Sequence, residues 1–234
     1  MKKLLLTFLA ATFVLASSMI AGAQDKTAIN NQLDKSAQLI QEMTASNANN
    51  AIPRKVIEDA KCIAVVPGLK QAGLIVGGRH GDGVATCKTS TGHWSPPAPF
   101  SLSGGSLGLQ AGAQSSDLVM MVMNQQGVQA LESGHFKVGG EVSGVAGPVG
   151  RDASPETTTS KAAILTYART KGVYGGVTVN GAELSENKKE TNSLYGSDVP
   201  FAQILHGQAP RTNDPAVHQF LATIHSAEAT AHAQ

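Results

Sequence analysis

Residues 62–88, CIAVVPGLKQAGLIVGGRHGDGVATCK, decide the fold of this chain. They contain three apolar runs of strand length: Cys62–Val66, Ala72–Gly78 and Val84–Lys88. Pro67-Gly68 separates the first run from the second, and the glycine-rich stretch Gly77–Gly83 separates the second from the third. Short apolar runs bounded by Gly and Pro are typical of β-strands joined by turns. We therefore expect strands here, with turns at Pro67-Gly68 and Gly77–Gly83.

The strand pattern continues towards the C-terminus. Ser103–Ala113 places glycines in a period-2 pattern, and Leu118–Met123 is a continuous apolar run. Two more strands are expected at Ile164–Ala168 and Gly175–Val179, the second followed by Asn180-Gly181. Because Asn-Gly favours the tight turns of β-hairpins, this dipeptide predicts a hairpin. Most of the strands are therefore expected to be antiparallel.

Helical patterns lie at both ends of the chain. Residues 27–46 place Ile29, Leu33 and Ile40 on one face, and residues 215–231 show a second apolar stripe. Shorter helices are expected at residues 53–60, 125–133 and 199–206. The sequence thus predicts an α+β fold with a central, mostly antiparallel, glycine-rich β-sheet or barrel-like sheet and helices at the N- and C-terminal ends.

The first 23 residues have the features of a secretory signal peptide. A basic start, Met1-Lys2-Lys3, precedes an apolar run and the small-residue pattern Ala21-Gly22-Ala23. We expect cleavage before Gln24, which leaves a single domain over residues 24–234 in the periplasm or outside the cell. Removing two lysines and no acid changes the formal net charge from +1 to −1. No later stretch is long and apolar enough for a transmembrane helix.

Composition excludes several classes of protein. The chain has a formal net charge of only +1 and so lacks the strong positive potential of a general nucleic-acid-binding protein. We therefore expect no nucleic-acid partner. A hydrophobic fraction of 41% is too high for a disordered polar chain. Cys62 and Cys87 are the only cysteines, and an oxidising compartment permits a disulfide between them. Two buried free thiols are the alternative, and the residues alone leave both open.

The sequence offers no strong catalytic or metal-binding motif. Gly104–Gly108 matches G-x-S-x-G around Ser106, but a nucleophile elbow needs a helix after the serine, and a strand pattern follows here. His218, His225 and His232 recur every seven residues, which is too long a spacing for two ligands of one metal ion. No phosphate-binding loop opens a helix. We expect neither a metal, a cofactor nor enzymatic activity.

Ordered motifs from Ile52 to Gly207 resemble the SYLF domain, a lipid-binding module. They are Ile52-Pro53, Ala60-Lys61, Ile63–Val66, Lys70-x-Ala72-Gly73, Gly81-x-Gly83-Val84, Trp94-Ser95-x-Pro97, Gly108-x-Gln110-x-Gly112-Ala113, Asp117, Asn124, Gly147-Pro148-x-Gly150-Arg151, Tyr167-x-x-Thr170-Lys171-Gly172, Gly175-Gly176-Val177, Asn192-x-x-Tyr195-Gly196 and Leu205-x-Gly207. The resemblance implies binding of acidic phospholipids and no established catalysis. It also implies that an N-terminal amphipathic segment assists lipid contact.

These observations predict an exported phospholipid-binding protein that associates peripherally with anionic membrane lipids. Lys70, Arg151 and Lys171 are the expected head-group contacts, because they lie in the motifs beside glycine-rich turns whose backbone N–H groups can bind anions. The face formed by Ile29, Leu33 and Ile40 either inserts into lipid or packs internally. The alternative function is a non-enzymatic envelope module that docks a protein partner, still to be identified, or self-associates.

Overall fold

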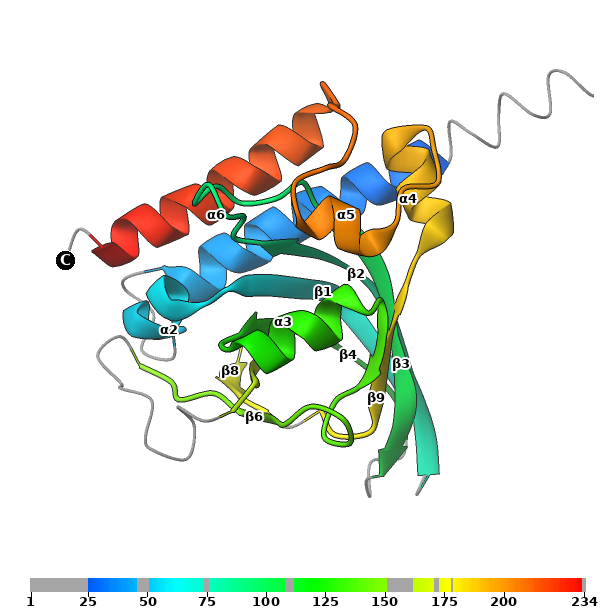
Figure 1. Cartoon of the computed structure of the whole chain (residues 1–234). Coiled ribbons are helices and arrows are strands. Elements are labelled where there is room, and N and C mark those ends of the chain that lie inside the picture. The colour runs from blue at the N-terminus through cyan, green and yellow to red at the C-terminus, as the bar shows by residue number, and fades with distance from the viewer. Residues whose placement is uncertain are drawn as a thin grey trace, which may run out of the picture.

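The computed structural model describes residues 25–45, 51–73, 76–107, 112–150, 162–170, 173–177 and 179–232. A strongly curled sheet forms the middle of the molecule, and helices cover it (Figure 1). The prediction of an α+β fold with a mostly antiparallel sheet and terminal helices is confirmed. The expected signal peptide, residues 1–23, lies outside the described residues.

The sheet contains nine strands in the order β5-β9-β3-β2-β1-β4-β7-β6, with β8 paired to β7. Among the strands of the described residues, only the β6–β7 pair is parallel. The strands are β1 (Cys62–Gly73), β2 (Val76–Cys87), β3 (Ala98–Leu107), β4 (Gly112–Val122), β5 (His135–Lys137), β6 (Gly144–Ala146), β7 (Ile164–Thr170), β8 (Val173–Gly176) and β9 (Ala182–Glu186). The β1–β2 hairpin therefore lies at the centre, between β3 and β4.

Helices cover both faces of the sheet. The N-terminal helix (residues 25–44), drawn in blue in Figure 1, and α6 (Pro215–His232) cover one face together with α2 (Arg54–Asp59). The opposite face is covered by α3 (Gln125–Glu132) and α5 (Phe201–Leu205). The remaining helix, α4 (Lys188–Tyr195), follows β9. In the described part of the chain, we find no helix with the length and apolar character that a membrane crossing requires.

Where helices cover both faces of the sheet, the central strands are buried on both sides. In β1, Ile63 and Val65 pack beneath the N-terminal helix and α6, whereas Cys62, Ala64 and Val66 pack beneath α3 and α5. All five side chains are at most 1% exposed. This explains why residues 62–66 form an unbroken apolar run instead of alternating with polar residues.

Two predicted turns are wrong, because strands run through both. Pro67-Gly68 forms a bulge inside β1, where the register shifts and Gly68 adopts a positive φ of 71°. All of the Gly77–Gly83 stretch lies in β2 and pairs with β3, and its first four residues also pair with β1. Glycine serves close packing there, since a Cβ on Gly83 would overlap the Phe100 ring.

The hairpin predicted at Asn180-Gly181 is also wrong. The turn exists, with Gly181 at φ 75°, but the flanking strands do not pair with each other. Instead, β8 pairs with β7, whereas β9 pairs with β3 and β5. The Gly181 backbone N–H donates to Val138, which lies in a different part of the chain. Tertiary contacts therefore override the local hairpin signal.

Candidate functional site

The central strands extend beyond the helices at one end of the sheet, where the ends of β2 and β3 project at the lower right of Figure 1. We call this region the four-strand end: Lys70–Gly73, Val76–Gly81, Ser103–Leu107 and Gly112–Ser116. Register places one row of side chains across it on one face: Ser103, His80, Lys70 and Ser115. All four residues are exposed. The row thus presents hydroxyl, imidazole and ammonium groups to solvent.

The four-strand end is cationic in a chain that is otherwise balanced. Residues 67–81 and 102–116 contain Lys70, Arg79 and His80 but no Asp or Glu. Among the described residues, Lys70 has no ion-pair partner. The nearest acid in the same row is Glu183 of β9, which already pairs with Lys137. Positive charge at this end is therefore not cancelled locally.

Arg79 lies on the other face of the same strands. Its Nε and Nη2 atoms donate to the Gly105 carbonyl oxygen of β3 at 3.2 and 2.9 Å. Burial lowers the pKa of Arg79 from its usual value, but a guanidinium remains charged in proteins. Arg79 consequently ties β3 to β2 while keeping its positive charge at the projecting end.

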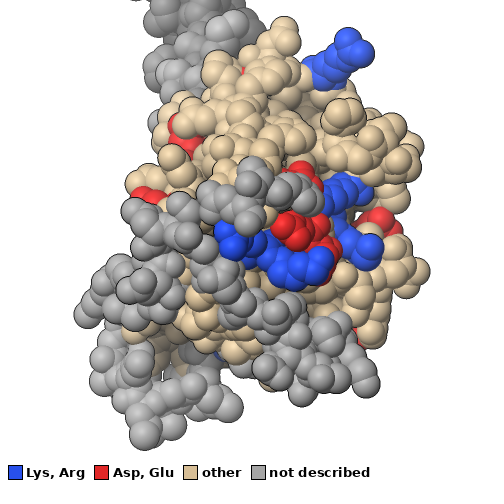
Figure 2. Space-filling view, turned by 90° about the vertical axis from the view of Figure 1, so that its left-hand side faces the viewer, with Lys and Arg blue, Asp and Glu red and all other residues tan. Residues whose placement is uncertain are grey.

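A second charged region lies on the face that carries α2 and the end of α6. Figure 2 shows basic and acidic side chains interleaved in one cluster there. Lys55 pairs with Asp59 at 2.9 Å and with Glu58 at 3.8 Å. Lys55 is thus matched by two carboxylates, which reduces its net field.

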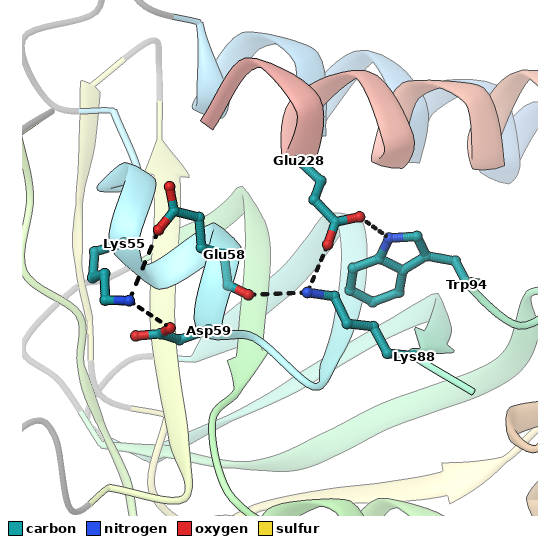
Figure 3. Close-up of polar contacts among 6 residues, drawn as sticks. All are labelled: Lys55, Glu58, Asp59, Lys88, Trp94 and Glu228. Carbon is teal, nitrogen blue, oxygen red and sulfur yellow. Dashed lines mark hydrogen bonds and ion pairs between the residues drawn. The ribbon is translucent and has the colours of Figure 1, made fainter. Parts of the chain in front are cut away.

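Lys88 connects three elements in this cluster (Figure 3). Its Nζ atom lies 2.7 Å from Glu228 of α6, 2.9 Å from the Glu58 carbonyl oxygen and 5.2 Å from the centre of the Trp94 ring. The Trp94 Nε1–H also donates to Glu228 at 2.9 Å. These contacts fasten α2 and α6 to the sheet.

A partly buried polar cluster lies where α4 meets β2 and β3. Ser101 Oγ donates to Asp82 at 2.7 Å, and Asn187 caps α4 by accepting from the Glu190 backbone N–H at 3.1 Å. Burial, reinforced by the Asp82 carboxylate, raises the pKa of Glu190 to about 7, although Lys189 opposes this. One Glu190 oxygen is buried without a hydrogen-bond partner. Ionisation of Glu190 is therefore linked to the stability of the fold.

The structure separates the residues that the sequence singled out. Ile29, Leu33 and Ile40 are 0% exposed and pack in the core, which is the internal-packing alternative. Lys70 is exposed at the four-strand end, whereas Arg151 and Lys171 lie outside the described residues. Hence Lys70 alone of the expected head-group contacts can be located.

The cysteines and the remaining motif residues can also be placed. Cys62 and Cys87 face each other across β1 and β2 and are joined by a disulfide. Ser106 belongs to the end of β3, so its backbone is a strand and not a nucleophile elbow. In the portions of the chain that are described, no group of three His, Cys, Asp or Glu residues could hold a metal ion.

Sequence reasoning missed Arg79 and His80 because it assigned them to a turn. Had Gly77–Gly83 been interpreted as a strand, alternation would have placed Lys70 and His80 on one face opposite Arg79. It also missed the contacts of Lys88 with Glu228 and of Trp94 with Glu228. These residues are 140 and 134 positions apart, and no local pattern indicates such pairs.

Comparison with known proteins identifies the family. Residues 103–227 match the Ysc84 family model, described as "Las17-binding protein actin regulator". The chain belongs to the Ysc84 family, whose shared module is the SYLF domain. It is 31% identical over 189 residues to human "SH3 domain-containing YSC84-like protein 1", covering 78% of this chain and 55% of the relative. The resemblance to the SYLF domain is thereby confirmed.

Yeast proteins show a similar degree of likeness. The chain is 30% identical over 197 residues to "Protein YSC84" of Saccharomyces cerevisiae, covering 80% of this chain and 42% of the relative. Another relative in the same yeast, "LAS seventeen-binding protein 3", is 31% identical over 197 residues. The chain thus spans about half the length of these Ysc84-family relatives.

Proposed function

We propose that this protein is an exported, non-enzymatic module that docks peripherally on anionic phospholipid surfaces through its four-strand end. The observation that carries the proposal is the segregation of Lys70, Arg79 and His80 at a projecting end, where residues 67–81 and 102–116 contain no acidic residue. A membrane surface is broad and negative, and a projecting end can approach it without obstruction from the helices (Figure 1). The resemblance to lipid-binding SYLF domains supports the same function.

Electrostatic attraction of this kind must be local, because the chain is nearly neutral overall. Each Lys or Arg near an anionic membrane contributes about 1 kcal/mol. Lys70 and Arg79 together then favour binding by about 2 kcal/mol, or roughly 30-fold in the partition coefficient. The attraction is expected to weaken strongly at about 1 M salt, where the screening length is only about 3 Å.

The other charged and apolar features suit a structural role better. Lys55 and Lys88 at the α2 end are paired with carboxylates, so they attract an anionic surface less. Ile29, Leu33 and Ile40 stabilise the core, and their insertion into lipid would require the N-terminal helix to leave the sheet. We therefore assign the membrane contact to the four-strand end and not to this helix.

The proposed location rests on residues 1–23, whose pattern is that of a secretory signal peptide. In a bacterial envelope, phosphatidic acid, phosphatidylglycerol and cardiolipin are the anionic lipids we expect it to meet. Their shared feature is an exposed phosphate, which can accept hydrogen bonds from ammonium and guanidinium groups.

Vesicle co-sedimentation tests the proposal. The purified protein should sediment with phosphatidylglycerol vesicles at low salt and much less with neutral phosphatidylcholine vesicles. Lys70→Gln should lower the partition coefficient about fivefold, which corresponds to the loss of about 1 kcal/mol. Lys55→Gln is the matched control, because it removes the same charge from α2, at the opposite end of the sheet. Equal partition to both vesicle types, or an equal effect of the two variants, would refute this binding surface.

Docking of a protein partner is the second candidate function. Its support is the family description, "Las17-binding protein actin regulator", and the name of one yeast relative, "LAS seventeen-binding protein 3". Retention of a defined envelope protein by a variant that no longer binds vesicles would favour this alternative. Loss of vesicle binding together with unchanged partner retention would separate the two functions.

A further inference from the structure

A cleft lies at the end of the sheet opposite the four-strand end. It has a volume of about 310 Å³ and is bounded by the end of α2, the start of β1, the end of β2, one face of α3 and the end of α5. This volume is at the lower limit of pockets that bind small molecules. Its position makes it separate from the surface proposed to contact the membrane.

The cleft has an apolar part and a charged rim. The disulfide between Cys62 and Cys87, together with Val128 and Leu205, supplies the apolar surface. The charged or polar lining residues are Glu58, Asp59, Lys61, Lys88, Gln125, Glu132 and His206. An apolar surface with a few convergent polar groups is typical of sites for small organic ligands.

Most of these charges are already compensated within the protein. Lys88 pairs with Glu228 at 2.7 Å, and Asp59 pairs with Lys55 at 2.9 Å. Glu58 also lies 3.8 Å from Lys55. These groups therefore hold the walls of the cleft in place more than they attract a ligand (Figure 3).

Two charges of opposite sign remain. Among the described residues, Lys61 has no ion-pair partner. In the same described part of the chain, the one ion-pair partner of Glu132 is His206, 3.5 Å away, which is charged only when protonated. One cation and one carboxylate are thus available to the same cleft.

The positions of these two residues indicate the length of the ligand. The Lys61 backbone N–H donates to Val122, just before the start of α3, whereas Glu132 is the last residue of that helix. Gln125 and Glu132 line the cleft seven residues apart, which is a rise of roughly 10 Å along the helix. A ligand that reaches both charges must carry them several bonds apart.

We propose that this cleft binds a zwitterion with phosphoethanolamine chemistry, whose phosphate contacts Lys61 and whose primary ammonium contacts Glu132. The apolar surface between them packs against the linking methylene groups. A single metal ion does not fit, because no three potential ligands converge in the described part of the molecule. A simple anion would leave Glu132 uncompensated beside it.

Isothermal titration of the purified protein at pH 8 tests this site. The probe is sn-glycero-3-phosphoethanolamine, with glycerol 3-phosphate and ethanolamine as its separate halves. We expect the zwitterion to bind at least ten times more tightly than either half. Lys61→Gln and Glu132→Gln should each weaken its binding at least tenfold, whereas Lys70→Gln should leave it unchanged.

Several outcomes would overturn the proposal. They are no detectable binding of the zwitterion, equal binding of a half, or insensitivity to both cleft substitutions. Lys61 is exposed and the Glu132 side chain is 24% exposed, so both variants are expected to fold, which far-ultraviolet circular dichroism checks. A variant that fails this check is replaced by Lys61→Arg or Glu132→Asp, which should retain part of the binding.

The same chemical group occurs in a free ester and in a phosphatidylethanolamine head group. Vesicles of phosphatidylethanolamine in phosphatidylcholine distinguish the two sources. Binding to these vesicles that is lost in Lys61→Gln and Glu132→Gln assigns the lipid, whereas cleft-dependent binding of the soluble ester alone assigns the free compound. Because Lys70→Gln affects only the proposed membrane surface, failure of one proposal is distinguishable from failure of the other.

Discussion

Glu190 makes the stability of the protein depend on pH. Its carboxyl group is packed between α4 and the sheet, and one of its oxygens is buried without a partner. Burial and the nearby Asp82 carboxylate disfavour the ionised form, which raises the pKa of Glu190 from 4.5 to about 7. In the unfolded chain, neither cause operates. The folded protein therefore retains the Glu190 proton over a pH range in which the unfolded chain has lost it.

The sign and size of the effect follow from this difference. Because the folded-state pKa is raised, the contribution of Glu190 to stability is fully present below about pH 4.5 and is lost as the pH rises to about 7. A shift of this size corresponds to at most about 3 kcal/mol at 1.36 kcal/mol per unit. Since the carboxyl group is partly open to solvent, screening reduces the expected effect to about 1–2 kcal/mol.

Glu190→Gln should remove this loss of stability. The amide has nearly the same size, cannot ionise and remains suitable for the third position of a capped helix. We expect the free energy of unfolding of the variant to exceed that of the wild type by about 1–2 kcal/mol at pH 8, with the difference vanishing near pH 4.5. Urea unfolding at several pH values measures the stability difference at pH 8 and its disappearance near pH 4.5. The fluorescence of the single tryptophan, Trp94, reports the unfolding.

Two variants make this experiment decisive. Asp82→Asn removes one cause of the raised pKa and should shift the transition in stability towards lower pH. Glu141→Gln, at an exposed glutamate, should reproduce the wild-type pH dependence. If Glu190→Gln changes stability equally at pH 5 and pH 8, or destabilises the protein at pH 8, the reasoning is refuted.

Three further perturbations test the packing. Gly147→Ala should destabilise the protein by about 1–3 kcal/mol, because the added Cβ would overlap the buried Tyr167 ring. Gly105→Ala is the control, since a Cβ there meets open space and should cost little. Equal urea midpoints for the two variants would contradict this prediction. Glu228→Gln should lower stability by about 1–2 kcal/mol, since Lys88 loses its carboxylate partner. It should also alter Trp94 fluorescence, because the indole N–H donates to the same carboxylate. An unchanged emission spectrum and an unchanged urea midpoint would count against this prediction. Reducing the Cys62–Cys87 disulfide, which closes a separation of 25 residues, should cost about 3 kcal/mol, and an unaltered melting temperature would argue otherwise.

Local sequence patterns identify several elements well. The N-terminal helix and α6 follow from apolar residues at three- and four-residue steps, because a single stripe must face the sheet. Leu118–Val122 was identifiable as a strand because its unbroken apolar run is buried on both faces. Such patterns can be recognised in the sequence because the burial of each side chain is reflected in the apolar or polar character of that residue itself.

Connections between strands were harder to predict. Gly81 and Gly83 look like turn residues, yet both lie in β2. Glycine is required at these positions because Leu69 and Phe100 approach the strand too closely for a side chain. Similarly, α4 was not predicted, since its polar segment shows only a weak apolar stripe and depends on the Asn187 cap. Glycine indicates close approach as well as a turn, and only the neighbouring strand decides between them.

The charge of the candidate site also could not be predicted from local sequence, because it depends on which acidic residues folding brings close to each lysine. Overall composition is nearly neutral, and Lys70 and Lys88 are equivalent in the sequence as single basic residues near glycines or strand ends. Folding brings Glu228 to Lys88 from 140 residues away but brings no carboxylate of the described residues to Lys70. The paired Lys88 and the unpaired Lys70 therefore lie at opposite ends of the same sheet. With the proposed membrane contact, this asymmetry predicts an orientation on an anionic surface in which the four-strand end faces the lipid.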